Sequence, residues 1–153
     1  MSHQRPVVVV PGILGSALRD GYPVGPRPVW GHMFPSLDRL GVHPEEPWRE
    51  PWPARVVPDG VLPGAYGELI EELRHDLSPA TDRPTPVYAF AYDWRRPLVT
   101  AEEELAGFLD EVVERTALLP HFREAGWDRR PEVDLVAHSM GGLVVAGALE
   151  RYG

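Results

Sequence analysis

The residues best suited to chemistry lie at positions 133–142, where the sequence reads VDLVAHSMGG. An apolar strand that runs into a serine and then into an apolar helix is the pattern of a nucleophile elbow, a sharp turn that lifts the serine oxygen above the edge of a sheet. Small residues must flank the serine at two positions' distance, and Ala137 and Gly141 stand there. The pattern predicts that Ser139 is the nucleophile of an ester-cleaving or acyl-transferring reaction. The alternative is an ordinary serine that caps a helix.

A serine hydroxyl is a weak nucleophile that needs a histidine base and an acid to orient that base. In proteins with this elbow, the acid and then the histidine follow the serine along the chain. After Ser139 the sequence contains one acid, Glu150, and no histidine. His138 is expected to point away from the serine, because neighbours in a tight turn diverge, and to pack or form a hydrogen bond behind the elbow. The sequence therefore predicts a nucleophile without its base and acid.

Acyl transfer also needs two backbone N–H donors for the oxyanion of its transition state. Met140 directly follows the serine and supplies the first donor. The second comes from the loop after an early strand, which here is the Pro-Gly-Ile-Leu-Gly segment at 11–15. Gly12 and Gly15 are also compatible with a plain tight turn. A dinucleotide site is a third reading, but its third glycine is missing.

The segment from Tyr22 to Pro63 has no sustained periodicity and holds ten of the 18 prolines and three of the five tryptophans. Such a long irregular stretch is typical of a lid, a binding loop or disorder, and tryptophans argue against disorder. We expect a lid-like excursion over 22–63, with a short helix near 33–40 and a ribbon near 55–57. Its tryptophans either form an acyl-binding lid or anchor the loop on the core; they are Trp30, Trp48 and Trp52.

The rest of the chain alternates strand and helix patterns. Apolar runs predict buried strands over 7–10, 87–92 and 133–137. A helix is predicted to begin at Thr100, where Glu103 completes a capping box, and another covers 143–152. A further helix follows from an apolar stripe, which comprises Tyr66, Leu69, Ile70, Leu73 and Leu77. This order predicts a single α/β domain over 1–153, with parallel strands, helices on both faces and the active site at the carboxyl ends of the strands.

Composition argues against several classes of protein. The formal net charge is −8, with 15 Lys and Arg against 23 Asp and Glu, so nucleic acid and anionic membranes are not expected partners. Cysteine is absent, which fits a reducing compartment. No apolar run approaches the roughly 18 residues of a membrane span, and no leader precedes the first strand, so we expect a soluble cytoplasmic protein. No histidine has metal-ligand spacing, and neither a metal nor a cofactor is expected.

Three segments together resemble the lecithin:cholesterol acyltransferase family of α/β hydrolases, which includes lysosomal phospholipase A2 and related bacterial lipases. They are PVVVVPGILGSAL at 6–18, YDWR at 92–95 and AHSMGG at 137–142, in the family's order. The resemblance spans this chain but only the amino-terminal half of the family's domain. It implies that Ile13, after the Pro-Gly pair, donates the second oxyanion N–H, and that Asp93 and Arg95 are scaffold. The chain lacks the cysteines of the family's lid disulfide and carries Ala137 in place of a frequent glycine.

The expected function is that of a serine lipase, esterase or O-acyltransferase that acts on lipid-like or small esters through an acyl-enzyme. Ser139 attacks the ester, and the N–H groups of Met140 and Ile13 hold the oxyanion. One alternative is a catalytically silent fragment or one piece of a complementing pair. Another is a nucleotide-binding α/β module, which lacks a supporting phosphate loop. If the strand at 133–137 lies at the sheet edge, its apolar faces also favour self-association.

Overall fold

The computed structural model describes residues 4–21, 27–35, 37–41 and 56–153. Its secondary structure has the mixed α/β composition that the sequence predicts. In chain order the elements are β1 (Val7–Val10), β2 (Ser16–Asp20), β3 (Arg27–Trp30), the 3-10 turn η1 (Leu37–Arg39), β4 (Val56–Val61), α1 (Pro63–Leu77), β5 (Val87–Ala89), α2 (Leu98–Ala117), α3 (Pro120–Glu124), the 3-10 turn η3 (Trp127–Arg129), β6 (Asp134–Ala137) and α4 (Met140–Tyr152).

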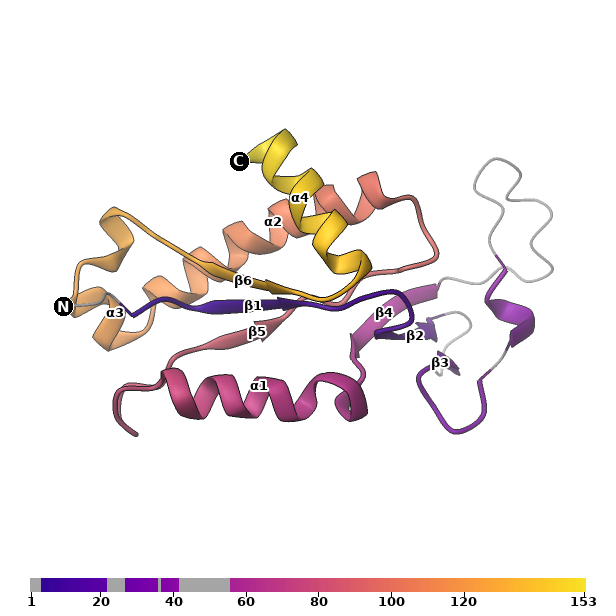
Figure 1. The fold of residues 1–153 in the computed structure, drawn as a ribbon, viewed down its shortest axis with the longest axis horizontal. Coiled ribbons are helices and arrows are strands. Elements are labelled where there is room, and N and C mark those ends of the chain that lie inside the picture. Colours follow the sequence, from indigo (N-terminus) through magenta and orange to yellow (C-terminus); the bar gives the residue numbers. More distant parts are fainter. Residues whose placement is uncertain (1–3, 22–26, 36, 42–55) are drawn as a thin grey trace.

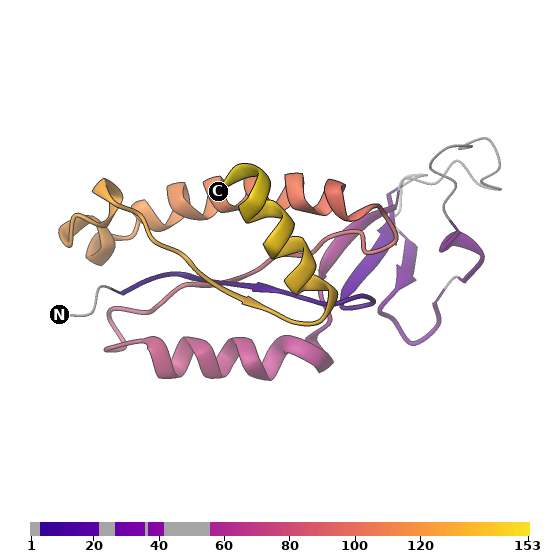
Figure 2. The ribbon, with the colours of Figure 1, turned by 45° about the horizontal axis from the view of Figure 1, so that its top comes forward.

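The central sheet consists of three parallel strands in the order β5-β1-β6. Helix α1 covers one face of this sheet, and α2 and α4 cover the other (Figures 1 and 2). The predicted parallel sheet with helices on both faces is therefore confirmed. Within the described residues β6 pairs only with β1, so it lies at the edge of the sheet.

Strand β1 lies at the centre of the sheet, and each of its four residues is valine. Successive side chains of a strand point to opposite faces, and a β-branched run on both faces suits a strand covered on both sides. Val8 and Val10 pack in one apolar cluster with residues of α2 and α4. Val7 and Val9 pack in the other, with Tyr66 and Ile70 of α1. All four valines are buried, so β1 joins the two layers of the core.

A second, antiparallel sheet of order β3-β2-β4 lies beyond the carboxyl end of β1 (Figures 1 and 2). The described parts of the segment at 22–63, where we expect the lid-like excursion, contain β3, η1 and β4, and its residues 22–26, 36 and 42–55 lie outside the described residues. The ribbon expected near 55–57 belongs to β4, and the helix expected over 33–40 is reduced to the single turn η1. The sequence does not predict β3, because Pro28 stands inside this strand and a register shift interrupts its pairing with β2.

Two predicted boundaries also differ from the structure. The strand predicted over 87–92 is shorter, since β5 ends at Ala89. The Phe90 N–H still donates to the Val9 carbonyl of β1 at 2.9 Å, but the Tyr92 N–H donates to the Ser16 hydroxyl instead. The capping box at Thr100 is wrong: α2 begins at Leu98, and the Thr100 N–H donates to the Pro97 carbonyl. The apolar stripe of α1 is confirmed, with Tyr66 and Ile70 buried.

The layer between α2 and the sheet supplies a direct test of the core. Leu105 is completely buried there, so we expect Leu105→Ala to lower the free energy of unfolding by about 2–5 kcal/mol through lost burial and a residual cavity. Leu118 follows the same helix with 68% of its surface exposed, and Leu118→Ala should change stability by less than about 0.5 kcal/mol. Urea unfolding measures both; equal midpoints for the two variants would contradict this packing.

Candidate active site

Ser139 lies at the turn between β6 and α4, as the sequence predicts for an elbow. Its backbone has φ 54° and ψ −125°, a conformation that residues with a side chain rarely adopt. The turn is held by the His138 N–H, which donates to the Val10 carbonyl at 3.0 Å, and by the Gly141 N–H, which donates to the His138 carbonyl at 2.9 Å. The serine residue is exposed. Ser139 therefore stands in a strained, open strand-to-helix turn.

Gly141 allows α4 to approach the end of β1. A Cβ atom on this residue would lie 2.5 Å from the Val10 carbonyl oxygen and 2.6 Å from that of Pro11. Both contacts are with backbone, which cannot move away as a flexible side chain would. The requirement for a small residue two positions after the serine thus has a physical cause in this chain.

The loop after β1 touches the elbow. A Cβ on Gly12 would lie 3.0 Å from the Cβ of Ser139. The loop closes on itself through the Gly15 N–H, which donates to the Gly12 carbonyl at 3.0 Å, and Leu14 has a positive φ of 64°. The tight turn predicted from the two glycines is present, and it lies beside the serine.

The N–H groups of Ile13 and Met140 are the two predicted oxyanion donors. Ile13 belongs to the loop that contacts Ser139, and Met140 is the first residue of α4. Within the described part of the chain, neither backbone N–H donates a hydrogen bond. The positive end of the α4 dipole also faces this position. Both predicted donors therefore lie on the two segments that meet at the serine.

A buried tyrosine connects the loop to the elbow, and sequence reasoning missed this role. The Tyr66 hydroxyl accepts a hydrogen bond from the Gly12 N–H at 2.9 Å and lies 3.0 Å from Nδ1 of His138. The hydrogen bond predicted for His138 behind the elbow is thus present. The sequence predicts Tyr66 only as a member of the apolar stripe of α1. The signal available in the sequence was its polar end, since a buried tyrosine hydroxyl usually has a partner.

The YDWR segment braces the loop rather than facing the serine. Asp93 and Arg95 form a buried bidentate pair with distances of 2.7 and 2.8 Å. The Trp94 indole donates to the Ser16 carbonyl at 3.0 Å. Burial, together with the nearby Tyr66, raises the pKa of Tyr92 to about 12, and its hydroxyl donates to the Pro11 carbonyl at 2.9 Å.

Of the three tryptophans in the proline-rich segment, only Trp30 lies within the described residues. Its indole donates to the Leu14 carbonyl at 2.9 Å, and its ring packs edge-on against Trp94 with centroids 5.7 Å apart. These contacts fit the expectation that tryptophan anchors this segment on the rest of the protein. Trp48 and Trp52 lie outside the described residues.

No described histidine forms a hydrogen bond with the Ser139 hydroxyl. His75 contacts Asp76, and His121 contacts the Pro84 carbonyl. His138 is engaged with Tyr66. The described residues also contain no cluster of three side chains suited to a metal ion, and none of their helices is long and apolar enough to cross a bilayer.

In comparisons with known proteins, the chain matches no family model, no curated protein and no solved structure.

The two adjacent glycines of α4 test the packing of the elbow. We expect Gly141→Ala to lower the free energy of unfolding by about 1–3 kcal/mol, since its Cβ would overlap backbone oxygens. A Cβ on Gly142 meets nothing within 4 Å, and Gly142→Ala should stabilise the chain by about 0.4–1 kcal/mol. Thermal and urea unfolding measure both variants, and we expect the free energy of unfolding to fall in Gly141→Ala and to rise in Gly142→Ala. Equal effects would mean that α4 does not approach β1 as described.

Proposed function

We propose that Ser139 is the nucleophile of a serine hydrolase or O-acyltransferase that acts on lipid-like or small esters. The observation that carries this proposal is the backbone of Ser139, with φ 54° and ψ −125° in an exposed turn. Strained conformations of this kind have an energetic cost and occur preferentially at functional sites. An ordinary helix-capping serine needs no such backbone, because a cap residue normally has β-region dihedrals.

The geometry supports a two-step acyl transfer. The Ser139 oxygen attacks the ester carbonyl carbon, and the carbonyl oxygen takes up the electron pair beside the N–H groups of Ile13 and Met140. Collapse of this intermediate breaks the bond to the leaving alcohol, which takes a proton, and leaves an acyl-serine. Water or a second alcohol then receives the acyl group. No described histidine forms a hydrogen bond with the Ser139 hydroxyl, so in this chain the serine proton passes to solvent.

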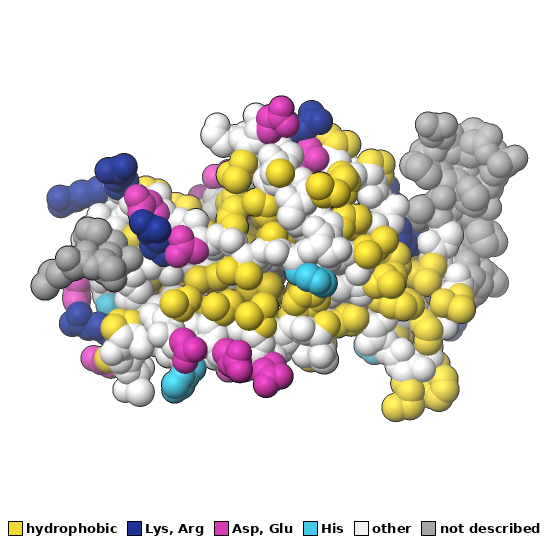
Figure 3. All heavy atoms as spheres, in the orientation of Figure 1, with side chains coloured by type: hydrophobic (Ala, Val, Ile, Leu, Met, Phe, Trp, Pro, Cys, Tyr) yellow, Lys and Arg dark blue, Asp and Glu magenta, His cyan; other side chains and the backbone are white. Residues whose placement is uncertain are grey.

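The apolar surface near the site favours an apolar ester. Ile13 and Leu14 of the loop are exposed at 56% and 42%, and Met33 and Phe34, which follow β3, are exposed at 87% and 84%. Hydrophobic side chains gather over this end of the molecule in the space-filling view (Figure 3). Contiguous exposed apolar surface commonly marks a binding site. Together with the three sequence segments, this surface supports an activity of the lecithin:cholesterol acyltransferase type.

A catalytically silent role is the second candidate. It is favoured by His138, whose Nδ1 is engaged with Tyr66 and not with the serine. One measurement separates a silent chain from a chain whose nucleophile lacks only its base. In the second case Ser139 reacts with an acyl-transfer inhibitor, and in the first it does not. The nucleotide-binding alternative has no supporting observation.

The proposed nucleophile is tested with an alkyl fluorophosphonate followed by intact-mass and peptide mass spectrometry. The serine oxygen bonds to phosphorus, fluoride leaves, and the hydroxyl proton passes to the buffer. We expect slow labelling at Ser139, complete loss in Ser139→Ala and no change in Ser78→Ala, which alters an ordinary serine at the end of α1. Labelling spread evenly over surface serines would contradict the proposal.

Turnover of an activated ester should be low for this chain. Enzymes that lose a member of the catalytic triad retain roughly 10³-fold acceleration over water from binding and the oxyanion donors. We expect this chain to accelerate the hydrolysis of p-nitrophenyl butyrate by roughly 10³-fold over the reaction in water. If the chain instead turned over the ester as fast as an ordinary lipase, and Ser139→Ala abolished this activity, a histidine before the elbow would be acting as the base.

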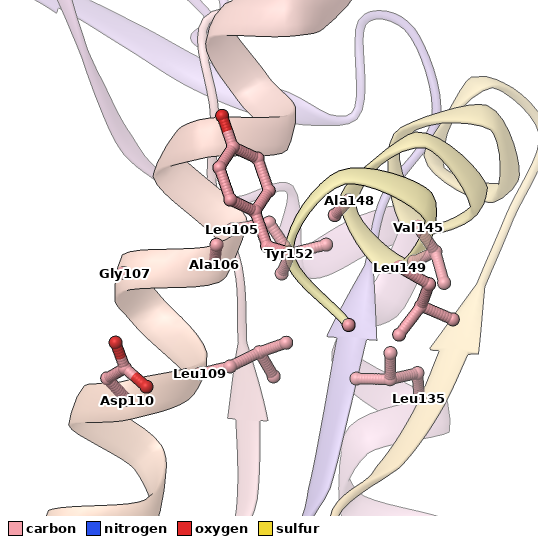
Figure 4. A pocket seen from close by; sticks show the side chains of 11 residues that line it. Leu105, Ala106, Gly107, Leu109, Asp110, Leu135, Val145, Ala148, Leu149 and Tyr152 are labelled. Atoms are coloured by element: carbon pink, nitrogen blue, oxygen red, sulfur yellow. The ribbon is translucent and has the colours of Figure 1, made fainter.

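We also propose that the chain self-associates through the β6 side of the sheet. Beside this edge lies an apolar groove of about 370 Å³ between α2, β6 and α4, lined by Leu105, Leu109, Leu135 and Leu149 among others (Figure 4). An open edge strand with apolar neighbours favours pairing with another chain.

Size-exclusion chromatography with light scattering tests this association. We expect oligomers that dissociate in Leu149→Lys, since Leu149 lines the groove with 54% of its surface exposed. Leu118→Lys places the same charge on an exposed leucine away from the groove and should leave the oligomer intact. A monodisperse wild-type monomer with a sharp, high-temperature melt would contradict the proposal.

A further inference from the structure

We propose that Tyr66 is a positioning residue that locks the oxyanion loop against the nucleophile elbow. This inference rests on the proposed function and extends it to a residue on α1, a helix that contributes no reacting group. The hydroxyl of Tyr66 contacts both segments that meet at Ser139: the Gly12 N–H on one side and Nδ1 of His138 on the other. The ring also packs edge-on against the imidazole, with centroids 6.0 Å apart.

The loop is shaped around this hydroxyl. A Cβ on Gly15 would lie 2.9 Å from the Tyr66 oxygen, so the glycine leaves the space that the hydroxyl occupies. The first turn of α1 is tied to the same loop, because the Leu62 N–H donates to the Gly15 carbonyl at 2.9 Å. Tyr66 is only 6% exposed. Water therefore does not readily replace its two polar contacts.

The hydrogen-bond directions explain how one hydroxyl fixes two segments. The Gly12 N–H is a donor only, so the tyrosine oxygen accepts there and its single proton remains available. The second contact joins the same hydroxyl to Nδ1 of His138 at 3.0 Å, and the tautomer of the imidazole sets which of the two atoms donates. The Gly12 contact also fixes the Pro11–Gly12 peptide. This peptide is adjacent to the one that carries the Ile13 N–H, the proposed oxyanion donor. Loss of the hydroxyl would leave both the Gly12 N–H and Nδ1 of His138 without this partner.

Such a residue acts on the transition state rather than on substrate binding. An oxyanion donor works only when it is held in place before the reaction, and a displacement of about 1 Å can lower the rate by about 10²-fold. The expected signature is a lower rate of the chemical step with unchanged affinity. If the tyrosine had only a structural role, its loss would lower stability without a selective fall in the rate of the chemical step.

The test compares Tyr66→Phe, which removes only the hydroxyl, with Tyr88→Phe, whose hydroxyl contacts Thr116 on the α2 side of the sheet. The fluorophosphonate places its phosphoryl oxygen where the oxyanion forms. We expect Tyr66→Phe to lower the maximal labelling rate of Ser139 by roughly 10- to 100-fold, with the half-saturating concentration within about twofold of wild type. Tyr88→Phe should label like wild type. Far-ultraviolet circular dichroism confirms that each variant is folded.

Amide hydrogen exchange of Gly12 gives a second readout that needs no reactivity. The wild-type amide should exchange slowly, and Tyr66→Phe should accelerate it by about 10-fold or more while Tyr88→Phe does not. Equal labelling rates for Tyr66→Phe and wild type, or a Gly12 amide that already exchanges freely in wild type, would overturn the inference. If wild type and Ser139→Ala label alike, the proposed function itself is wrong, and this result is distinct from the other two.

Discussion

The rest of the structure depends on the burial of β1. Its four valines bury apolar surface on both faces of the sheet, and each is worth about 1.5–3 kcal/mol relative to an exposed side chain. Because β1 pairs with β5 and β6 and is covered by α1 on one face and by α2 and α4 on the other, its carboxyl end has little freedom to move. The candidate site is built on that end.

Contacts with the carboxyl end of β1 stabilise the strained backbone of Ser139. A residue such as Ser139 in a sparsely populated backbone region costs of order 1–3 kcal/mol, which the surrounding contacts must offset. The Val10 carbonyl contributes twice, since it accepts the His138 N–H and limits the residue at 141 to glycine. The elbow is therefore stable because α4 and β6 both contact the end of β1.

The second sheet and α1 hold the other half of the site. Pairing of β2 with β4 brings the start of α1 to the loop after β1, and Trp30 and Trp94 brace that loop from the side of β3. Asp93 pairs with Arg95 at 2.7 Å and with Arg96 at 3.7 Å, and the Arg95 guanidinium also donates to the Leu40 carbonyl. Positions far apart in the chain thus bring the loop that contains Ile13 against the turn that contains Ser139 and Met140.

Local patterns in the sequence determined the central strands, the apolar face of α1, the elbow at Ser139 and the turn with its two glycines, because each depends on residue types at short spacing. Contacts between distant residues decided the rest. The strand β3 contains Pro28 and has an interrupted register, so only its pairing with β2 reveals it. The hydroxyl of Tyr66 reaches Gly12 across 54 positions and His138 across 72. No local pattern encodes such contacts, because they exist only once β1 has brought the loop, the elbow and α1 together.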